Sequence, residues 1–256
     1  MKEYLQQLKK VEAKERFVDS VKYKTYEQLG STCYNLDIFD QSLRYYDSAL
    51  QIGLVLFGQR SLQTAELYSK FYILNVNVGD YASAYDYVTQ SYSIISEKVS
   101  SDNPTLAMAT GRIGEFWIET STRPEDLRNA LQYLNDAVEI LNLPRNKDNY
   151  FRHVQFHFVF SKAYLKLGDY KSARSYIDKA LQLWNENQKI HGPPAELLTH
   201  KAKILLAMGE FRQAIQLIDQ SSVVYASGGY NELARNYTLK GDVYNSQHKS
   251  DSALFF

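Results

Sequence analysis

The sequence predicts an all-α repeat protein, and three observations support this fold class. The 256 residues include only 12 glycines and 5 prolines, which favours long helices over turn-rich β structure. A short motif that combines a glycine, an acidic residue, an aromatic residue and an alanine recurs along the chain. Apolar and small residues follow each copy at helical spacing. The chain is therefore expected to fold as a series of helical hairpins.

The recurring motif is typical of the turn between two antiparallel helices. Its clearest copies are Leu167–Ala173 and Met208–Ala214, and Val78–Ala84 is nearly identical. In each copy the glycine can end the first helix in a left-handed conformation, and the acidic residue can cap the second helix. The alanine lets the two backbones approach. In a fourth copy, Asp37 occupies the glycine position.

The second helix of each hairpin is expected to bury one face. The residues that predict this lie three apart: Tyr46 and Ala49, Val88 and Ser91, Leu134 and Ala137, Ile177 and Ala180, Ile218 and Ser221. Between two copies, Asn103 can cap a helix that has Pro104 at its first position. Ser121 to Pro124 form a short insertion between the helices of the third copy.

Tyr26–Gly30 (YEQLG) and the motifs above resemble the tetratricopeptide repeat, a pair of antiparallel helices. The spacing between copies exceeds the usual 34 residues and is similar to the longer style of kinesin light chain and of bacterial repeat proteins. The resemblance covers about Tyr23 to Phe256 and implies a right-handed α-α superhelix of about five full repeats plus a truncated sixth. The small residue in each first helix marks the copies: Gly30, Tyr72 (a departure, since a small residue is preferred), Gly114, Ser161, Ala202 and Gly241.

The sequence also suggests how the chain is organised. Residues 1–20 carry apolar side chains at helical intervals and are expected to form a leading helix that covers the first repeat. Residues 21–256 form the repeat solenoid. Residues 252–256 start the second helix of a sixth repeat, so we expect the solenoid to continue beyond Phe256.

Composition excludes several classes of function. Lys+Arg and Asp+Glu both number 29, so the basic surplus that drives nucleic-acid binding is absent. No apolar run approaches the length of a membrane span. A single cysteine, Cys33, and the lack of a signal peptide favour a reducing, cytoplasmic setting. His153 and His157 share a helix face, but neither they nor Cys33 has the neighbours of a metal or catalytic site, and packing explains all three. No catalytic residue, metal site or cofactor is expected.

The resemblance implies that the first helix of each pair lines a concave groove that holds a partner peptide. Apolar residues in the middle of this wall would accept hydrophobic anchors, and asparagines could bind an extended backbone. The carboxylate-clamp pattern of cochaperones is absent. The candidate groove residues are Tyr34, Asn35, Ile73, Val76, Asn77, Glu115, Ile118, Phe158, Lys162, Leu165 and Lys203.

The leading functional hypothesis is a non-catalytic scaffold that binds a protein or peptide segment along the concave surface. The alternative is the regulatory or substrate-recruiting arm of a larger bacterial enzyme, such as a caspase-like protease or a sensor kinase, in which the wall contacts a downstream domain of the same chain. A receptor for a short signalling peptide is a third hypothesis, disfavoured because residues 1–20 are too short for a DNA-binding segment. Binding on the convex side or an edge stays open.

Overall fold

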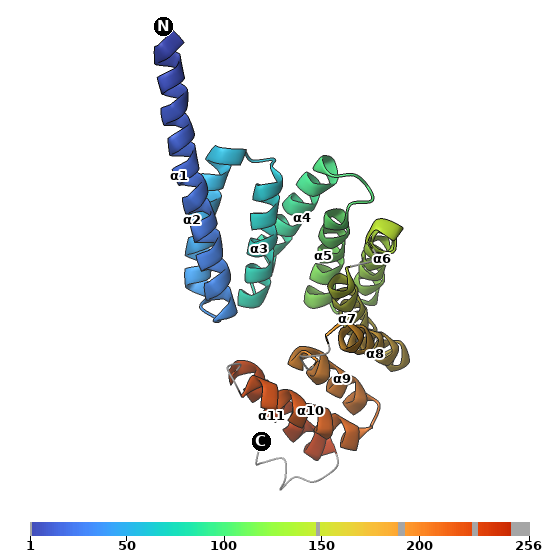
Figure 1. Cartoon of the computed structure of the whole chain (residues 1–256). Coiled ribbons are helices and arrows are strands. Elements are labelled where there is room, and N and C mark those ends of the chain that lie inside the picture. Colours follow the sequence, from blue (N-terminus) through green and yellow to red (C-terminus); the bar gives the residue numbers. More distant parts are fainter. Residues whose placement is uncertain (1, 147–148, 189–192, 227–229, 247–256) are drawn as a thin grey trace. The chain divides into compact units, whose positions relative to one another are not determined.

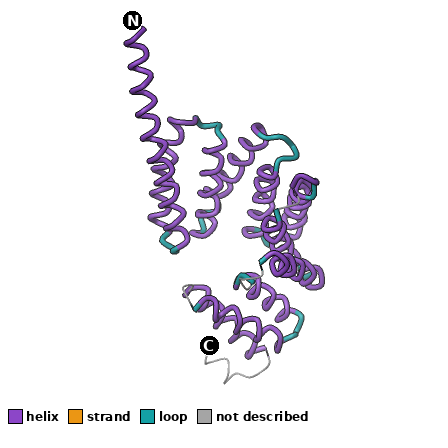
Figure 2. The backbone as a smooth tube through the Cα atoms, viewed as in Figure 1, coloured by secondary structure: helices purple, strands orange, loops and turns teal. Residues whose placement is uncertain are grey.

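The computed structural model describes residues 2–146, 149–188, 193–226 and 230–246, and within these ranges every regular element is a helix. Figures 1 and 2 show the helices joined by short loops. The all-α prediction is confirmed. The described elements are α1 (Lys2–Asn35), α2 (Phe39–Phe57), α3 (Leu62–Val78), α4 (Tyr81–Lys98), α5 (Pro104–Thr120), α6 (Pro124–Leu141), a 3-10 turn (Pro144–Asn146), α7 (Tyr150–Lys166), α8 (Tyr170–Asn187), α9 (Ala195–Ala207), α10 (Phe211–Tyr225) and α11 (Tyr230–Ser246).

The chain divides into two compact units, Met1–Phe116 and Trp117–Phe256, which we call unit 1 and unit 2 and describe separately. Unit 1 contains α1 to α4 and most of α5, and unit 2 contains the last turn of α5 and α6 to α11. Within the units, α1 packs on α2, α3 on α4, α7 on α8 and α9 on α10 as hairpins. The predicted second helix of the sixth repeat lies outside the described residues.

The N-terminal helix includes both the leading segment and the first helix of the first hairpin. α1 is continuous from Lys2 to Asn35, so no boundary separates residues 1–20 from the first helix of the first hairpin. The reason is local, because the sequence contains neither glycine nor proline before Gly30 and offers no residue that would end a helix there.

Four first helices end in the same way. Within two residues of the helix end, one residue has a left-handed conformation, and its own amide and the next amide bond back to the helix. At the end of α7, Gly168 N donates to Leu165 O at 3.1 Å and Asp169 N donates to Tyr164 O at 3.0 Å. The predicted turns are thus confirmed, including the one without glycine. The left-handed residues are Gly79 (φ +82°), Gly168 (φ +77°), Gly209 (φ +78°) and Asp37 (φ +57°).

The acidic residue of the motif caps the following helix in two of the three predicted cases. Asp80 accepts from Ser83 N and Asp169 accepts from Ser172 N, both at 3.1 Å. The hydroxyls of the same two serines also donate to the aspartates, and these bonds, followed by the backbone ones, lower the pKa of both carboxyl groups. Glu210 is the exception, because its longer carboxylate accepts from Arg174 Nη1 at 2.6 Å and makes no cap bond.

The hairpin interiors are held by small residues and by hydroxyls that cross between helices. Ser42 Oγ donates to Gly30 O at 2.8 Å, and Ser161 Oγ donates to Ala173 O at 2.7 Å. All these groups are buried, so each hydroxyl has exchanged water for a partner in the facing helix. The predicted residue pairs of the second helices are buried as well: Tyr46, Ala49, Val88, Ser91, Leu134, Ala137, Ile177, Ala180, Ile218 and Ser221.

Candidate functional site

The predicted site residues lie on the first helix of each hairpin. We call these surfaces first-helix walls: α1, α3 and α5 up to Phe116 in unit 1, and the last turn of α5 with α7, α9 and α11 in unit 2. Tyr34, Asn35, Ile73, Val76, Asn77 and Glu115 belong to unit 1, and Ile118, Phe158, Lys162, Leu165 and Lys203 belong to unit 2.

In unit 1 the wall contains a polar hollow of about 440 Å³ between α1 and α3. An ion pair between Lys70 Nζ and a Glu27 carboxylate oxygen, 2.5 Å apart, forms one side. Gln28 and Asn35 lie seven residues apart on the α1 face of the hollow, and the side-chain amide of neither has a partner among the described residues. The lining residues are Glu27, Gln28, Ser31, Thr32, Asn35 and Lys70.

The remaining predicted residues of unit 1 are more engaged. Asn77 is exposed, but its Nδ2 donates to Tyr34 Oη at 3.1 Å and to Ile73 O at 2.8 Å. This amide therefore ties α1 to α3 and has little capacity left to donate to a ligand. Ile73, Val76 and Glu115 are half-buried.

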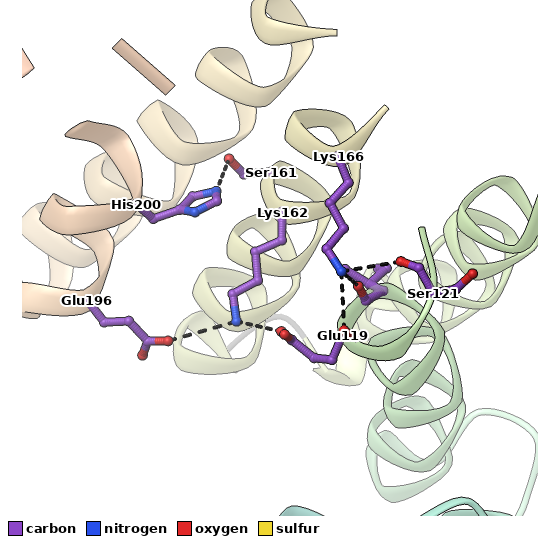
Figure 3. Close-up of polar contacts among 8 residues, drawn as sticks. Glu119, Ser121, Ser161, Lys162, Lys166, Glu196 and His200 are labelled. Atoms are coloured by element: carbon purple, nitrogen blue, oxygen red, sulfur yellow. Dashed lines mark hydrogen bonds and ion pairs between the residues drawn. The ribbon is translucent and has the colours of Figure 1, made fainter. Parts of the chain in front are cut away.

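In unit 2 the wall carries a lysine between two carboxylates (Figure 3). Lys162 Nζ on α7 lies 2.8 Å from Glu119 Oε1 at the end of α5 and 3.9 Å from Glu196 Oε1 on α9. The ammonium also lies 4.4 Å from the centre of the Phe158 ring, a cation–π distance. Three neighbouring first helices thus meet at one charged group.

Lys166, one turn further along α7, closes the end of α5 (Figure 3). Its Nζ donates to the carbonyl oxygens of Ile118, Glu119 (3.2 Å) and Ser121 (3.3 Å). Such carbonyls at a helix C-terminus have no partner within the helix, and together they carry partial negative charge. A cation from another hairpin satisfies them here.

Two residues expected to offer an apolar surface are part of the interior instead. The side chain of Ile118 has 0% of its surface exposed and that of Phe158 has 9%. Phe158 packs edge-on against His200, with 5.2 Å between ring centres. Leu165 is half-buried and packs against the same cluster as Phe158. Because neighbouring first helices pack through these positions, the wall of unit 2 is more polar than the sequence predicts.

His200 was not among the predicted residues, yet it lies in the middle of this wall. Its Nε2 lies 3.0 Å from Ser161 Oγ, whose single hydrogen is donated to Ala173 O. His200 Nε2 therefore carries the proton and donates. Burial, and then the charges of Lys162 and Lys203, lower the pKa of His200 to about 3. The imidazole is thus neutral at physiological pH.

Lys203 on α9 and Arg235 on α11 form the far part of the wall. Lys203 is exposed, but the surrounding protein partly desolvates it and this lowers its pKa. Lys162 and Arg235 add repulsion in the same direction, whereas Glu119 and Glu196 act in the opposite one. Arg235 was not among the predicted residues, although its position six residues before Gly241 in the repeat register places it on the wall.

Other features of the described residues lie away from the predicted site. A second hollow of about 510 Å³ in unit 2 is lined by Trp117, Asp126, Asn129, Gln132, Tyr133 and Asp136. In the part of the chain that the structure describes, no group of three or more His, Cys, Asp or Glu residues could hold a metal ion. No described helix is long and apolar enough to cross a membrane.

Several solved structures share this fold. A Rap protein complexed with competence and sporulation factor aligns with a TM-score of 0.68 and 16% identity, over 91% of this chain and 72% of that one. BtubC from P. vanneervenii aligns with a TM-score of 0.62 and 15% identity, over 87% of each chain. A signal transduction ATPase with a tetratricopeptide repeat sensor, from Pyrococcus horikoshii, aligns with a TM-score of 0.61 and 13% identity, over 99% of this chain and 40% of that one. At such low identity these alignments show the fold alone.

A family model for the tetratricopeptide repeat matches residues 154–186, which cover most of α7 and α8. The chain thus contains a tetratricopeptide repeat at α7 and α8. The resemblance seen in the sequence is thereby confirmed, and the matched repeat is the one that carries Phe158, Lys162 and Lys166. The search of curated proteins found no match to this sequence.

Proposed function

We propose that the protein is a non-catalytic scaffold whose first-helix walls bind a segment of a partner protein. The tetratricopeptide-repeat fold supports the general assignment, because repeat proteins of this kind use extended surfaces for binding. The single observation that carries the peptide-binding proposal is the pair of unpartnered amides, Gln28 and Asn35, on the polar hollow of unit 1.

The chemistry of these two amides suits an extended backbone. Each side-chain amide can donate and accept, which matches the alternating N–H and C=O groups of a peptide. Seven helical residues span about 10 Å, and an extended chain covers that distance in about three residues. The Glu27–Lys70 ion pair at the edge of the hollow adds one charge of each sign for side chains of the ligand.

A peptide library displayed on phage, selected against the folded protein, tests this proposal. Enriched peptides are then synthesised and their affinities measured by isothermal titration calorimetry. Replacing Gln28 and Asn35 together with alanine is expected to weaken binding at least tenfold, or about 1.4 kcal/mol. The matched control replaces Gln51 and Gln90, exposed amides on the second helices α2 and α4.

Two results contradict the proposal. If no peptide is enriched, the chain lacks the proposed binding function. If enriched peptides bind the Gln28/Asn35 variant as tightly as the wild type, the hollow of unit 1 is not the site.

The second proposal is that the chain is the regulatory or recruiting arm of a larger enzyme. It is favoured by the alignment of 99% of this chain with a signal transduction ATPase that carries a tetratricopeptide repeat sensor. Sequencing the reading frame beyond Phe256 tests it, since a solenoid cap without a catalytic domain contradicts this alternative.

A further inference from the structure

Lys162 and Lys203 occupy equivalent positions in neighbouring repeats of unit 2. Each lysine directly follows the small residue that marks its first helix, Ser161 in α7 and Ala202 in α9. Both markers are fully buried, so the structure confirms the register that equates them. The surroundings of the two lysines can therefore be compared position by position.

The residue on the preceding helix carries opposite charges in the two repeats. The neighbour of Lys162 is Glu119, five residues after Gly114 in α5. The residue five positions after Ser161 in α7 is Lys166. The position equivalent to Glu119 therefore holds a cation in the next repeat. Lys166 is also directed elsewhere, to the carbonyl oxygens at the end of α5.

The residue on the following helix also carries opposite charges in the two repeats. The second neighbour of Lys162 is Glu196, six residues before Ala202 in α9. The residue six positions before Gly241 in α11 is Arg235. Both carboxylates that flank the first lysine are thus replaced by cations in the next repeat.

Within the described residues, neither Lys203 nor Arg235 forms an ion pair. The two cations instead repel one another, and this contributes to the lowered pKa of Lys203. Their helices are joined by a partly buried hydrogen bond from Thr199 Oγ1 to Asn236 Oδ1 at 3.0 Å, and Asn236 Nδ2 also donates to Ser221 Oγ of α10 at 2.7 Å. The positive charges are therefore carried by two helices that contact one another.

We propose that the first-helix wall of unit 2 binds an acidic segment of a partner protein. The carboxylates of this segment contact Lys203 and Arg235, in the same way that Glu119 and Glu196 flank Lys162. This inference rests on the proposed scaffold function, since it names the kind of partner that the wall selects. Lys162 shows that a carboxylate fits this register at 2.8 Å from the ammonium. Repulsion between unpaired cations is relieved when an anion binds between them.

A fluorescein-labelled hexaglutamate peptide is the probe, and hexaglutamine is the matched neutral peptide. Fluorescence anisotropy at low ionic strength should show hexaglutamate binding that weakens with added salt, and no comparable binding of hexaglutamine. Arg235→Glu is expected to weaken hexaglutamate binding at least tenfold. The control, Arg212→Glu, reverses an exposed arginine on the second helix α10 and should change binding less than twofold.

A second measurement follows the lysine itself. After reductive methylation with carbon-13, the Lys203 signal reports its pKa by NMR. The pKa should rise when hexaglutamate binds. It should also rise in free Arg235→Glu, because the new carboxylate gives Lys203 the partner that Glu196 gives Lys162. Circular dichroism checks that each variant is folded.

Equal binding of hexaglutamate to Arg235→Glu and Arg212→Glu overturns the inference, as does equal binding of hexaglutamate and hexaglutamine to the wild type. These failures are distinct from failure of the scaffold function. Suppose that the phage library yields neutral peptides whose binding depends on Gln28 and Asn35, while the binding of hexaglutamate does not depend on Arg235. The scaffold proposal then stands and the acidic partner is wrong. If the library yields no peptide at all, the scaffold proposal itself fails.

Discussion

Two turns of this protein provide hydrogen-bond donors for the last carbonyl groups of a helix in different ways. The turn from α7 to α8 satisfies the last carbonyls of α7 locally, through Gly168 in a left-handed conformation and two amides that bond back to the helix. The turn from α5 to α6 contains no residue with positive φ. There Ser121 N donates to Trp117 O at 2.9 Å, and Lys166 from α7 supplies the remaining donor.

The difference shows which parts of a repeat protein depend on their neighbours. A turn closed by its own backbone can form with its hairpin alone. A turn closed by Lys166 is complete only when α7 is in place, because the donor comes from more than 40 residues further along the chain. The end of α5 is therefore stabilised by tertiary structure rather than by its own sequence.

Among the substitutions in these two turns, Lys166→Met should lower the free energy of unfolding the most. The methionine keeps the length of the side chain but leaves the α5 carbonyls without the ammonium, which should cost about 1 to 2 kcal/mol. Urea denaturation followed by circular dichroism measures the change. Lys24→Met, on the exposed face of α1, is the matched control and should stay within about 0.5 kcal/mol of the wild type. Equal stability of the two variants would mean that Lys166 does not close the helix.

Gly168→Ala tests the locally closed turn. A Cβ at this position would meet no atom within 4 Å, so the change affects only the backbone conformation. An alanine at φ +77° is expected to cost about 1 kcal/mol. The same denaturation experiment measures it, and an unchanged midpoint would contradict a left-handed residue at this turn.

Asp37→Gly is the reverse substitution at the one such turn, among those described, that lacks a glycine. Because Asp37 has φ +57°, glycine should relieve strain and stabilise the first hairpin by about 0.5 kcal/mol. Thermal denaturation monitors the gain. A loss of stability would show that the aspartate side chain contributes more than its backbone conformation costs.

Ser121→Ala tests the turn from α5 to α6 through the pH dependence of its hydrogen bonds. Hydrogen bonds from Arg123 and from Ser121 lower the pKa of Asp126 to about 2. Because the folded pKa lies below the unfolded value of about 4, this carboxylate contributes stability above pH 4 and loses it as the pH falls toward 2. In Ser121→Ala the pKa of Asp126, followed by carbon-13 NMR, should rise but stay below its usual value because Arg123 remains.

The control for that titration is Thr122→Ala, which alters an exposed neighbour in the same loop. It should leave the pKa of Asp126 unchanged. An identical shift in both variants would assign the effect to the loop rather than to the Ser121 hydroxyl.

Most of the fold could be predicted from the sequence because its signals are local. Glycine at position 168, aspartate at 169 and alanine at 173 each specify a backbone state or a close approach within one hairpin, and the structure has all three. Asn103 likewise accepts from Thr105 N at 2.8 Å at the start of α5. Residues 2–20 are helical and continue into the first hairpin without a break, since the sequence before Gly30 contains no stop signal.

The candidate site was harder to predict because a position on the wall does not determine whether a side chain is open to solvent. Ile118 and Phe158 were expected to be accessible, but the packing between first helices buries them. Asn77 was expected to bind a ligand backbone, but Tyr34 and Ile73 already engage its donor. The pairing of Lys162 with Glu119 and Glu196 joins three helices, and no short stretch of sequence contains it.

By itself, the sequence determined the helical hairpins, their turns and the register of small residues, since each of these depends on the conformational preferences of neighbouring residues. Only the tertiary structure decided which charges meet, namely that Lys162 has two carboxylates and Lys203 faces Arg235. Electrostatic pairing depends on distances in space between residues that lie 32 to 43 positions apart in the chain, and these distances exist only after the helices have packed.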